Sequence, residues 1–130
     1  MTPVADRDQQ RKSLGVRGED MAVDFLEKKG YTILCRNYRC RSGEIDIVAR
    51  KKKILCFIEV KTRSTRAFGP PQEAVTPRKQ YKISRVALDF LQRHRLENWP
   101  ARFDVVAVDF TGGDGVIALI ENAFELAGQP

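Results

Sequence analysis

Residues 43–63 read GEIDIVARKKKILCFIEVKTR, and this stretch determines the expected organisation of the chain. Two runs rich in β-forming side chains, Glu44 to Ala49 and Ile54 to Lys61, flank a lysine turn at Lys51 to Lys53. The second run is almost continuously apolar until its end, which is typical of a strand buried on both faces. We therefore expect an antiparallel hairpin whose second strand lies at the centre of a sheet.

The segments on either side of this hairpin extend it to a larger domain. Ser13 can cap a first helix that ends before Gly30. Thr76 and Pro77 start a second helix, which runs to about Arg95. Apolar residues recur at three- and four-residue steps in both helices, so each helix has one face to bury. Further strands are expected at Tyr31 to Tyr38, Phe103 to Phe110 and Val116 to Ile120.

The expected order is helix, three strands, helix and two strands, which is typical of an α/β fold. Three consecutive strands with short turns favour an antiparallel meander, and the helix after the third strand favours a crossover to a parallel neighbour. We therefore expect a mixed central sheet flanked by helices. A single domain should span residues 13–130, and the polar residues 1–12 should form a flexible N-terminal segment.

The composition is basic and moderately apolar. The chain has 130 residues, of which 42% are hydrophobic, and this is enough for one core without disulfide bonds. The net charge of +6 favours a polyanionic partner, either nucleic acid or an anionic membrane surface. Three cysteines without CxxC spacing argue against a zinc site and fit reduced thiols. No apolar run resembles a signal peptide or spans a bilayer, so we expect a cytoplasmic protein that does not bind membranes.

Two acids and a lysine lie on the strands of the central hairpin. By strand alternation, Glu59 and Lys61 share one face of their strand. Asp46 should share a face with Glu44 and Val48 on the neighbouring strand. If the two strands pair, Asp46 and Lys61 approach each other at one end of the sheet. This set suits phosphodiester hydrolysis, because carboxylates hold Mg²⁺ or Mn²⁺ and an ammonium group can orient water or offset charge in the transition state.

The proposed ion would be bound by Asp46 and Glu59, with the carbonyl of Val60 as a further oxygen ligand. Acid and lysine pairs at strand ends are also common on solvated surfaces, so the tripeptide Glu59-Val60-Lys61 is weak evidence by itself. The combination is more informative. The tripeptide ends an apolar strand, an acid lies on the preceding strand, and basic segments flank both.

Two further candidate catalytic residues border the apolar faces of the helices. Glu19 is either an ordinary acid in the first half of a helix or a group beside the metal. Gln80 lies at helical spacing from Ile83 and Ala87, so it should point towards the sheet. It is either a hydrogen-bonded boundary residue or a group that positions phosphate or water. The sequence leaves both alternatives open.

Basic residues follow directly on the end of the central strand. They could neutralise the phosphates of a nucleic acid, whereas the lysines at 51–53 are more typical of a solvated turn. Phe68 or Tyr81 could stack on a base or belong to the core. The candidate nucleic-acid-binding residues are Arg63, Arg66, Arg78, Lys79 and Lys82.

Short motifs along the chain resemble one known family. They are Gly18-Glu19, Gly30-Tyr31, Asn37-Tyr38-Arg39, Gly43-Glu44-Ile45-Asp46, Glu59-Val60-Lys61-Thr62-Arg63, Thr76-Pro77-Arg78-Lys79-Gln80, Arg102-Phe103-Asp104-Val105-Val106 and Asn122-Ala123-Phe124. Together they resemble the YraN-like family of predicted endonucleases, which is related to archaeal Holliday junction resolvases of the PD-(D/E)XK class. The resemblance implies a restriction-endonuclease-like αβββαβ core. It also implies that Asp46, Glu59 and Lys61 match the catalytic motif, although Ile45 stands where that motif has proline. Glu19 then matches the acid of the first helix, and Gln80 matches the later polar residue.

The leading hypothesis is a divalent-metal-dependent DNA endonuclease, which could act on branched DNA such as Holliday junctions. The alternative is a non-catalytic nucleic-acid-binding protein with a vestigial nuclease fold. The two acids and the lysine favour the enzyme, because a pure binder does not need two carboxylates beside a phosphate. A protein-interaction adaptor would need an exposed apolar patch, which the sequence does not identify. Symmetric cutting of two strands would favour a homodimer, and the sequence leaves open whether the substrate is DNA or RNA.

Overall fold

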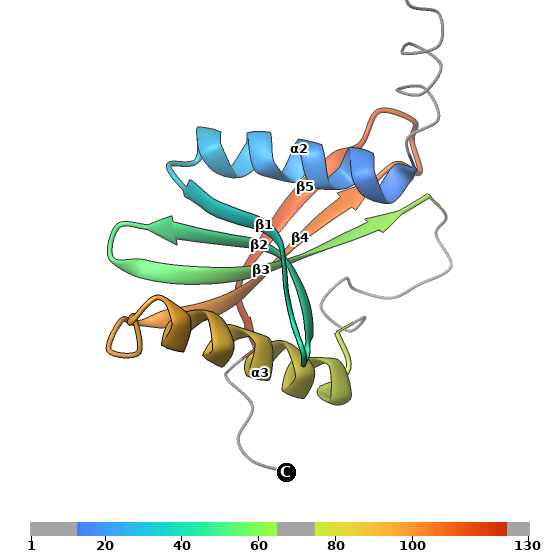
Figure 1. Ribbon diagram of the computed structural model, residues 1–130. Coiled ribbons are helices and arrows are strands. Elements are labelled where there is room, and N and C mark those ends of the chain that lie inside the picture. The colour runs from blue at the N-terminus through green and yellow to red at the C-terminus, as the bar shows by residue number, and fades with distance from the viewer. Residues whose placement is uncertain (1–12, 65–74, 125–130) are drawn as a thin grey trace, which may run out of the picture.

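The computed structural model describes residues 13–64 and 75–124 (Figure 1). Its elements are α2 (Leu14–Lys28), β1 (Thr32–Cys40), β2 (Gly43–Lys51), β3 (Ile54–Arg63), α3 (Pro77–Arg93), β4 (Ala101–Asp109) and β5 (Val116–Phe124). This is the predicted α/β order, and it contains the αβββαβ core. Residues 1–12, predicted to be flexible, lie outside the described residues, as do residues 125–130 of the predicted domain.

The described strands form one mixed sheet in the order β1-β2-β3-β4-β5. The pairs β1–β2, β2–β3 and β4–β5 are antiparallel, and β3 is parallel to β4. The crossover between the parallel strands contains α3. The predicted meander, the crossover and the central position of the third strand are therefore confirmed.

Both described helices begin at the predicted capping residues. The Oγ atom of Ser13 accepts a hydrogen bond from the N–H of Val16 at 3.2 Å, and Oγ1 of Thr76 accepts one from the N–H of Lys79 at 3.3 Å. Gly30 follows α2 with a φ of 91°, a backbone conformation that glycine adopts without strain. These local signals fix where each helix starts and where the first one ends.

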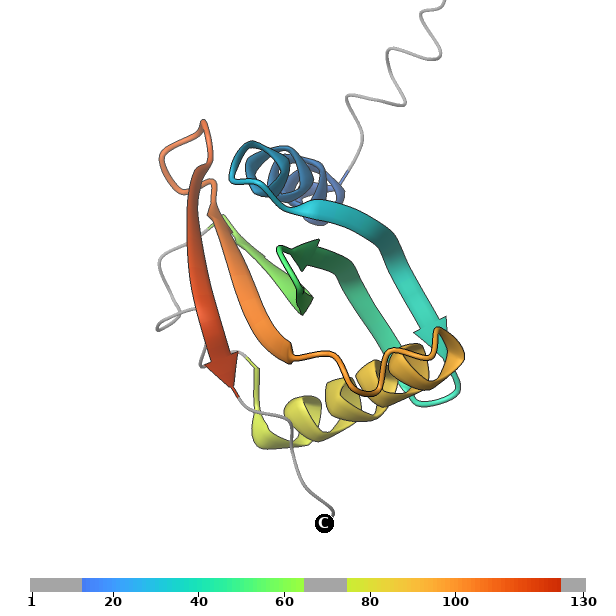
Figure 2. The ribbon, with the colours of Figure 1, turned by 90° about the vertical axis from the view of Figure 1, so that its left-hand side faces the viewer.

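The two helices cover opposite faces of the sheet, as Figures 1 and 2 show. The core on the α2 side includes Ala22, Leu26, Ile47, Ile58 and Val106. The core on the α3 side includes Ile45, Val48, Phe57, Val86 and Phe90. Each of the larger side chains stabilises the fold by about 1.5–3 kcal/mol when it is fully buried. Helix α3 buries Ile83, Val86, Ala87, Phe90 and Leu91, which confirms the single apolar face predicted for the second helix.

Neither of the helices in the described part of the chain is both long enough and apolar enough to cross a membrane.

The β1–β2 hairpin bends towards α3 at the end of the sheet (Figure 1). The hydroxyl of Tyr38 donates a hydrogen bond to Asp89 of α3, and the Tyr38 ring packs edge-on against Phe90 with ring centroids 5.1 Å apart. Nearer the turn, Gly43 lies beside Val86, and a Cβ atom at position 43 would make an ordinary van der Waals contact of 3.5 Å with Cγ2 of Val86. The hairpin and the first half of α3 therefore flank the end of β3 that carries the candidate catalytic residues.

Candidate active site

The strand β2 departs from regular alternation around Asp46. Residues two apart in a regular strand share a face. However, Ile45 packs into the core on the α3 side, whereas Ile47 packs into the core on the α2 side. Between them, Oδ2 of Asp46 accepts a hydrogen bond from the backbone N–H of Val60 on β3 at 2.8 Å. We predicted that Asp46 and Val48 share a face because side chains alternate in a regular strand. This strand does not alternate regularly, and the Asp46 carboxylate points towards the neighbouring strand β3.

Asp46 and Glu59 form a carboxyl pair. Burial raises the pKa of Glu59, and a hydrogen bond to Asp46 and the negative charge of Asp46 raise it further. The positive charge of Lys61 acts in the opposite direction and lowers the pKa of Glu59. Two neighbouring carboxylates repel when both are ionised, so such a pair either keeps a proton or binds a cation.

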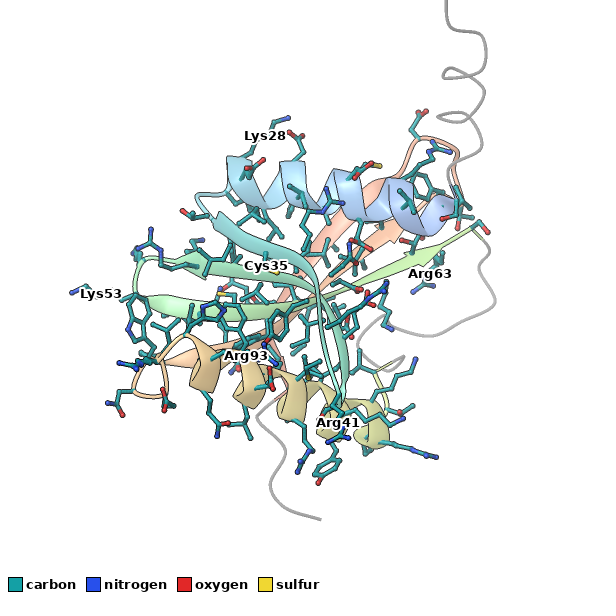
Figure 3. The ribbon with its side chains drawn as sticks, viewed as in Figure 1. Lys28, Cys35, Arg41, Lys53, Arg63 and Arg93 are labelled. Carbon is teal, nitrogen blue, oxygen red and sulfur yellow. The ribbon has the colours of Figure 1, made fainter. Side chains whose placement is uncertain are left out.

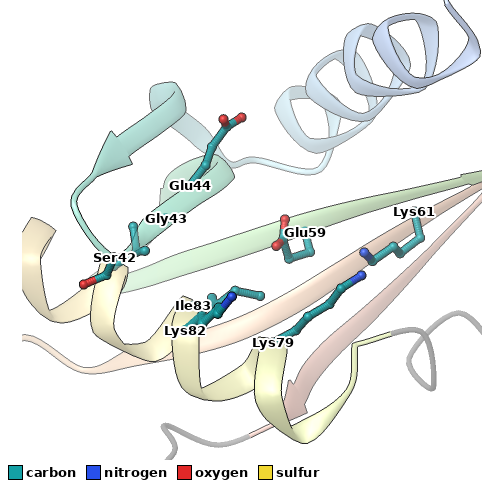
Figure 4. A pocket seen from close by; sticks show the side chains of 9 residues that line it. Ser42, Gly43, Glu44, Glu59, Lys61, Lys79, Lys82 and Ile83 are labelled. Carbon is teal, nitrogen blue, oxygen red and sulfur yellow. The ribbon is translucent and has the colours of Figure 1, made fainter.

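A cavity of about 190 Å³ opens beside Glu59 (Figure 4). It is lined by Ser42, Gly43, Glu44, Glu59, Lys61, Lys79, Lys82, Ile83 and Val86. Glu59 and Lys61 project from β3, and Figure 4 shows Lys79 of α3 reaching towards Lys61. The cavity thus places three ammonium groups beside Glu59, one member of the acid pair, and such an arrangement can hold a phosphate next to a cation.

Glu19 of α2 lies close to Asp46. Burial raises the pKa of Glu19, and the negative charge of Asp46 adds to this increase. The close approach of α2 to β3 depends on Gly18, because a Cβ atom at this position would lie 2.2 Å from Oγ1 of Thr62. The structure therefore brings Glu19 beside Asp46.

Gln80 does not line the cavity that contains Glu59 and Lys61. Its side-chain nitrogen donates a hydrogen bond to the carbonyl of Val75 at 2.9 Å, just before α3 begins. This contact fits the boundary role that the sequence left open. The structure does not bring Gln80 together with the acids.

The candidate basic residues have different positions. Lys79 and Lys82 line the cavity, and Arg78 is exposed on the first turn of α3. Arg63 ends β3, one residue beyond Thr62. Arg66 and Phe68 lie outside the described residues. Tyr81 is half-buried on α3, and the guanidinium of Arg85 lies 6.0 Å from the centroid of its ring.

Sequence reasoning missed Glu44 and Asn37 as members of the site. Glu44 lines the cavity and forms an ion pair with Arg39 at 2.7 Å. Asn37 has a positive φ of 54° within β1. The available signal was the polar pair Arg36-Asn37 inside a run of β-forming residues, since asparagine is depleted in strands and tolerates the left-handed conformation.

The donor set fits a hard divalent cation such as Mg²⁺. Among the described residues, no three His, Cys, Asp or Glu side chains are arranged to hold a metal ion. Magnesium does not need such a cage, because it keeps several waters and binds one or two carboxylates together with substrate phosphates. Asp46 and Glu59 supply two neighbouring carboxylates, and Lys61, which lines the same cavity as Glu59, could contact a phosphate bound beside them.

A larger cavity of about 570 Å³ lies between β1 and the C-terminal half of α3. It is lined by Leu34, Cys35, Tyr38, Phe90, His94 and Leu96. Carboxylates and ammonium groups are missing from this lining, so the acid and lysine chemistry belongs to the smaller cavity.

Comparison with known proteins identifies one family. The model of the "Uncharacterised protein family UPF0102" matches residues 18–108, which include the candidate site from Glu19 to Lys82. A UPF0102 protein of Geobacter sulfurreducens is 52% identical over 126 residues, which are 96% of this chain and 98% of that protein. One from Geobacter metallireducens is 54% identical over 116 residues, 89% of this chain and 95% of that protein. A relative from Caldicellulosiruptor saccharolyticus is 48% identical over 116 residues, 88% of this chain and 98% of that protein.

Proposed function

This chain belongs to the UPF0102 family, and we propose that it is a divalent-metal-dependent nuclease that hydrolyses phosphodiester bonds in DNA. One observation carries the proposal. Asp46 and Glu59 form a carboxyl pair at the end of the β2–β3 hairpin, and Lys61 projects into the same cavity as Glu59. These residues lie within the stretch 18–108 that the family model matches.

Asp46 and Glu59 would hold Mg²⁺ or Mn²⁺. When bound, the ion polarises the scissile phosphate and makes a coordinated water more acidic. Without the ion, the raised pKa of Glu59 favours a proton on the pair. The acids would therefore exchange a proton for the cation as the site is loaded.

Lys61 would act on the reacting phosphate. It follows Glu59 by two residues on the cavity side of β3, so its ammonium group can reach an oxygen of a phosphate held beside the acids. Negative charge increases on these oxygens in the transition state, and a positioned donor is most valuable there. Lys61 would thus contribute more to the rate than to binding.

Lys79 and Lys82 would bind the phosphates next to the scissile one. Both line the cavity from the first turns of α3 and face the end of β3. The net charge of +6 supports the same partner, because nucleic-acid affinity comes largely from contacts between cations and phosphates.

One observation favours the alternative function, a nucleic-acid-binding protein without catalysis. Gln80 bonds to Val75 and lies outside the cavity that holds the acids, so one polar group of the expected catalytic set is not in place. The acid pair itself favours the enzyme, because two carboxylates weaken phosphate binding unless a cation is present.

The experiment is incubation of the purified protein with linear duplex DNA, single-stranded DNA, four-way-junction DNA and RNA. Each substrate is tested with Mg²⁺, with Mn²⁺ and with a chelator. We expect metal-dependent cleavage of at least one DNA that is lost in Asp46→Ala and retained in Lys53→Ala, a control in the distant β2–β3 turn. DNA binding without cleavage under every condition would select the alternative.

A further inference from the structure

Asn37 interrupts β1 directly opposite Asp46. Its φ of 54° is left-handed, a conformation that asparagine tolerates better than most residues. The flanking residues Arg36 and Tyr38 pair with Ile47 and Ile45 of β2, so position 37 stands across from position 46. The left-handed residue of β1 therefore lies opposite the position in β2 where side chains stop alternating regularly between the two faces of the sheet.

The left-handed step lets two consecutive side chains of β1 reach the same acid of α2. In a regular strand, Arg36 and Asn37 would point to opposite faces. Here the Arg36 guanidinium lies 3.7 Å from Glu19. In the orientation that satisfies both ends of its amide, the nitrogen of Asn37 donates to Oε1 of Glu19 at 3.3 Å and to Oε1 of Glu44 at 3.1 Å. Asn37 thus links an acid of α2 to an acid of β2.

An uncharged amide suits this link. Its NH₂ group carries two protons, one for each carboxylate. A lysine or arginine at position 37 would also bind Glu19 and Glu44, but it would cancel part of the negative charge that attracts a cation to Asp46. The amide holds the two acids in place and adds no positive charge to that of Arg36 and Arg39, which already pair with Glu19 and Glu44.

We propose that Asn37 is a positioning residue of the nuclease site, which fixes the carboxylates of Glu19 and Glu44 around Asp46. The inference rests on the proposed function, because it assigns Asn37 a role towards the cation that Asp46 and Glu59 would hold. Asn37 itself does not bind that cation in this account. It acts through the two acids that it bridges.

The test compares Asn37→Gly with Asn122→Gly. Glycine can keep the left-handed backbone and removes the side chain with its amide. Asn122 is a matched control, because it is a second left-handed asparagine, with a φ of 51°, and it lies on β5 away from the cavity. Calorimetric titration with Mn²⁺ should show about tenfold weaker binding in Asn37→Gly, the low end for loss of a hydrogen bond among the residues that surround a metal site. In single-substrate kinetics, kcat should fall more than KM rises, and Asn122→Gly should match the wild type in both measurements.

A second measurement tests the bridge in the metal-free protein. The side-chain amide signals of Asn37 in nuclear magnetic resonance spectra should move upfield in Glu19→Ala. They should stay in place in Asp24→Ala, which removes another acid of α2 that pairs with Lys28. Unchanged signals in Glu19→Ala would overturn the bridge.

The outcomes separate the two proposals. If wild type binds Mn²⁺ and Asn37→Gly binds it equally well, the positioning role is wrong and the proposed nuclease site stands. If wild type binds no Mn²⁺, both the nuclease site and the role assigned to Asn37 are overturned, whatever the amide signals show.

Discussion

The backbone N–H of Val60 donates a hydrogen bond to the carboxylate of Asp46 at 2.8 Å. In a regular antiparallel pair, a backbone carbonyl of the partner strand would accept such a bond. Backbone pairing between β2 and β3 runs from the turn to the pair of Ile47 and Ile58. Beyond this pair, the side chain of Asp46 accepts the hydrogen bond in place of a backbone carbonyl. The site is therefore built where the hairpin stops pairing, and Glu59 lies at this point.

This bond predicts that two substitutions of Asp46 will separate stability from cation binding. Asp46→Asn keeps an oxygen that can accept the bond from Val60, so its free energy of unfolding should stay near that of the wild type. Asp46→Ala leaves the N–H without its partner and should lose about 1–3 kcal/mol. Urea denaturation followed by circular dichroism measures both. Neither variant should bind Mn²⁺ in calorimetry, and Mn²⁺ binding by Asp46→Asn at wild-type affinity would show that the charge of Asp46 is not needed.

The raised pKa of Glu59 predicts a pH dependence of stability. A carboxyl whose pKa is raised in the folded state stabilises the fold fully below its ordinary pKa of 4.5, and this contribution is lost as the pH rises through the folded-state pKa. Gln does not ionise, so the unfolding free energy of Glu59→Gln minus that of the wild type should increase between about pH 5 and pH 8. Curves that run parallel over this range would argue against a raised pKa of Glu59 in the folded protein. Adding Mn²⁺ should stabilise the wild type only.

The contact between Gly18 and Thr62 predicts a steric effect on the site. Gly18→Ala would place a Cβ atom 2.2 Å from Oγ1 of Thr62. It should therefore cost about 1–3 kcal/mol and push α2, with Glu19, away from β3. The double variant with Thr62→Ala should recover most of this loss. Gly15→Ala is the control, because its Cβ would meet only Oγ of Ser13 at 3.8 Å, and it should gain up to about 1 kcal/mol. Equal stability of Gly18→Ala and Gly15→Ala would contradict the close packing.

The lysines of α3 predict a measurable change in the salt dependence of DNA binding. Replacing both Lys79 and Lys82 by alanine should lower the slope of log affinity against log salt concentration by about 2, roughly one unit for each lost phosphate contact. Lys53→Ala should leave the slope unchanged, since Lys53 lies at the opposite end of β3 from Arg63 (Figure 3). Fluorescence anisotropy across a salt series gives these slopes. A similar change in all variants would point to net charge alone and not to a phosphate site at the cavity.

Much of this architecture could be predicted from the sequence because it depends on local chemistry. The caps at Ser13 and Thr76 use side-chain oxygens three residues before the N–H groups that they accept from. The apolar run before Glu59 marks a central strand, and the pairing of a hairpin follows from its short turn. These rules were sufficient to predict that Asp46, Glu59 and Lys61 lie at one end of the sheet.

The irregular positions could not be predicted, because they depend on contacts between elements. Asp46 and Asp104 are both strand acids that accept a backbone N–H of the adjacent strand, from Val60 and Asn122 at 2.8 Å in each case. Asp104 is fully buried and is paired with Arg102 at 3.1 Å, whereas Asp46 meets the acid Glu59. Only the residues that each acid contacts in the folded chain distinguish Asp104, whose charge is neutralised by Arg102, from Asp46, which suits a cation. The same reason applies to Gln80, which is half-buried on α3 but whose side chain bonds to Val75.

The most direct test of the proposed chemistry is the single-turnover cleavage rate of Lys61→Ala compared with that of the wild type, on the DNA that the wild type cuts best in Mg²⁺. Lys61 lines the cavity beside Glu59. Its ammonium group should stabilise mainly the transition state, in which negative charge increases on the phosphate oxygens. We predict a rate lower by about 100-fold or more, which is the scale for losing one positioned donor, with a much smaller change in DNA affinity. Cleavage by Lys61→Ala at the wild-type rate would contradict the account.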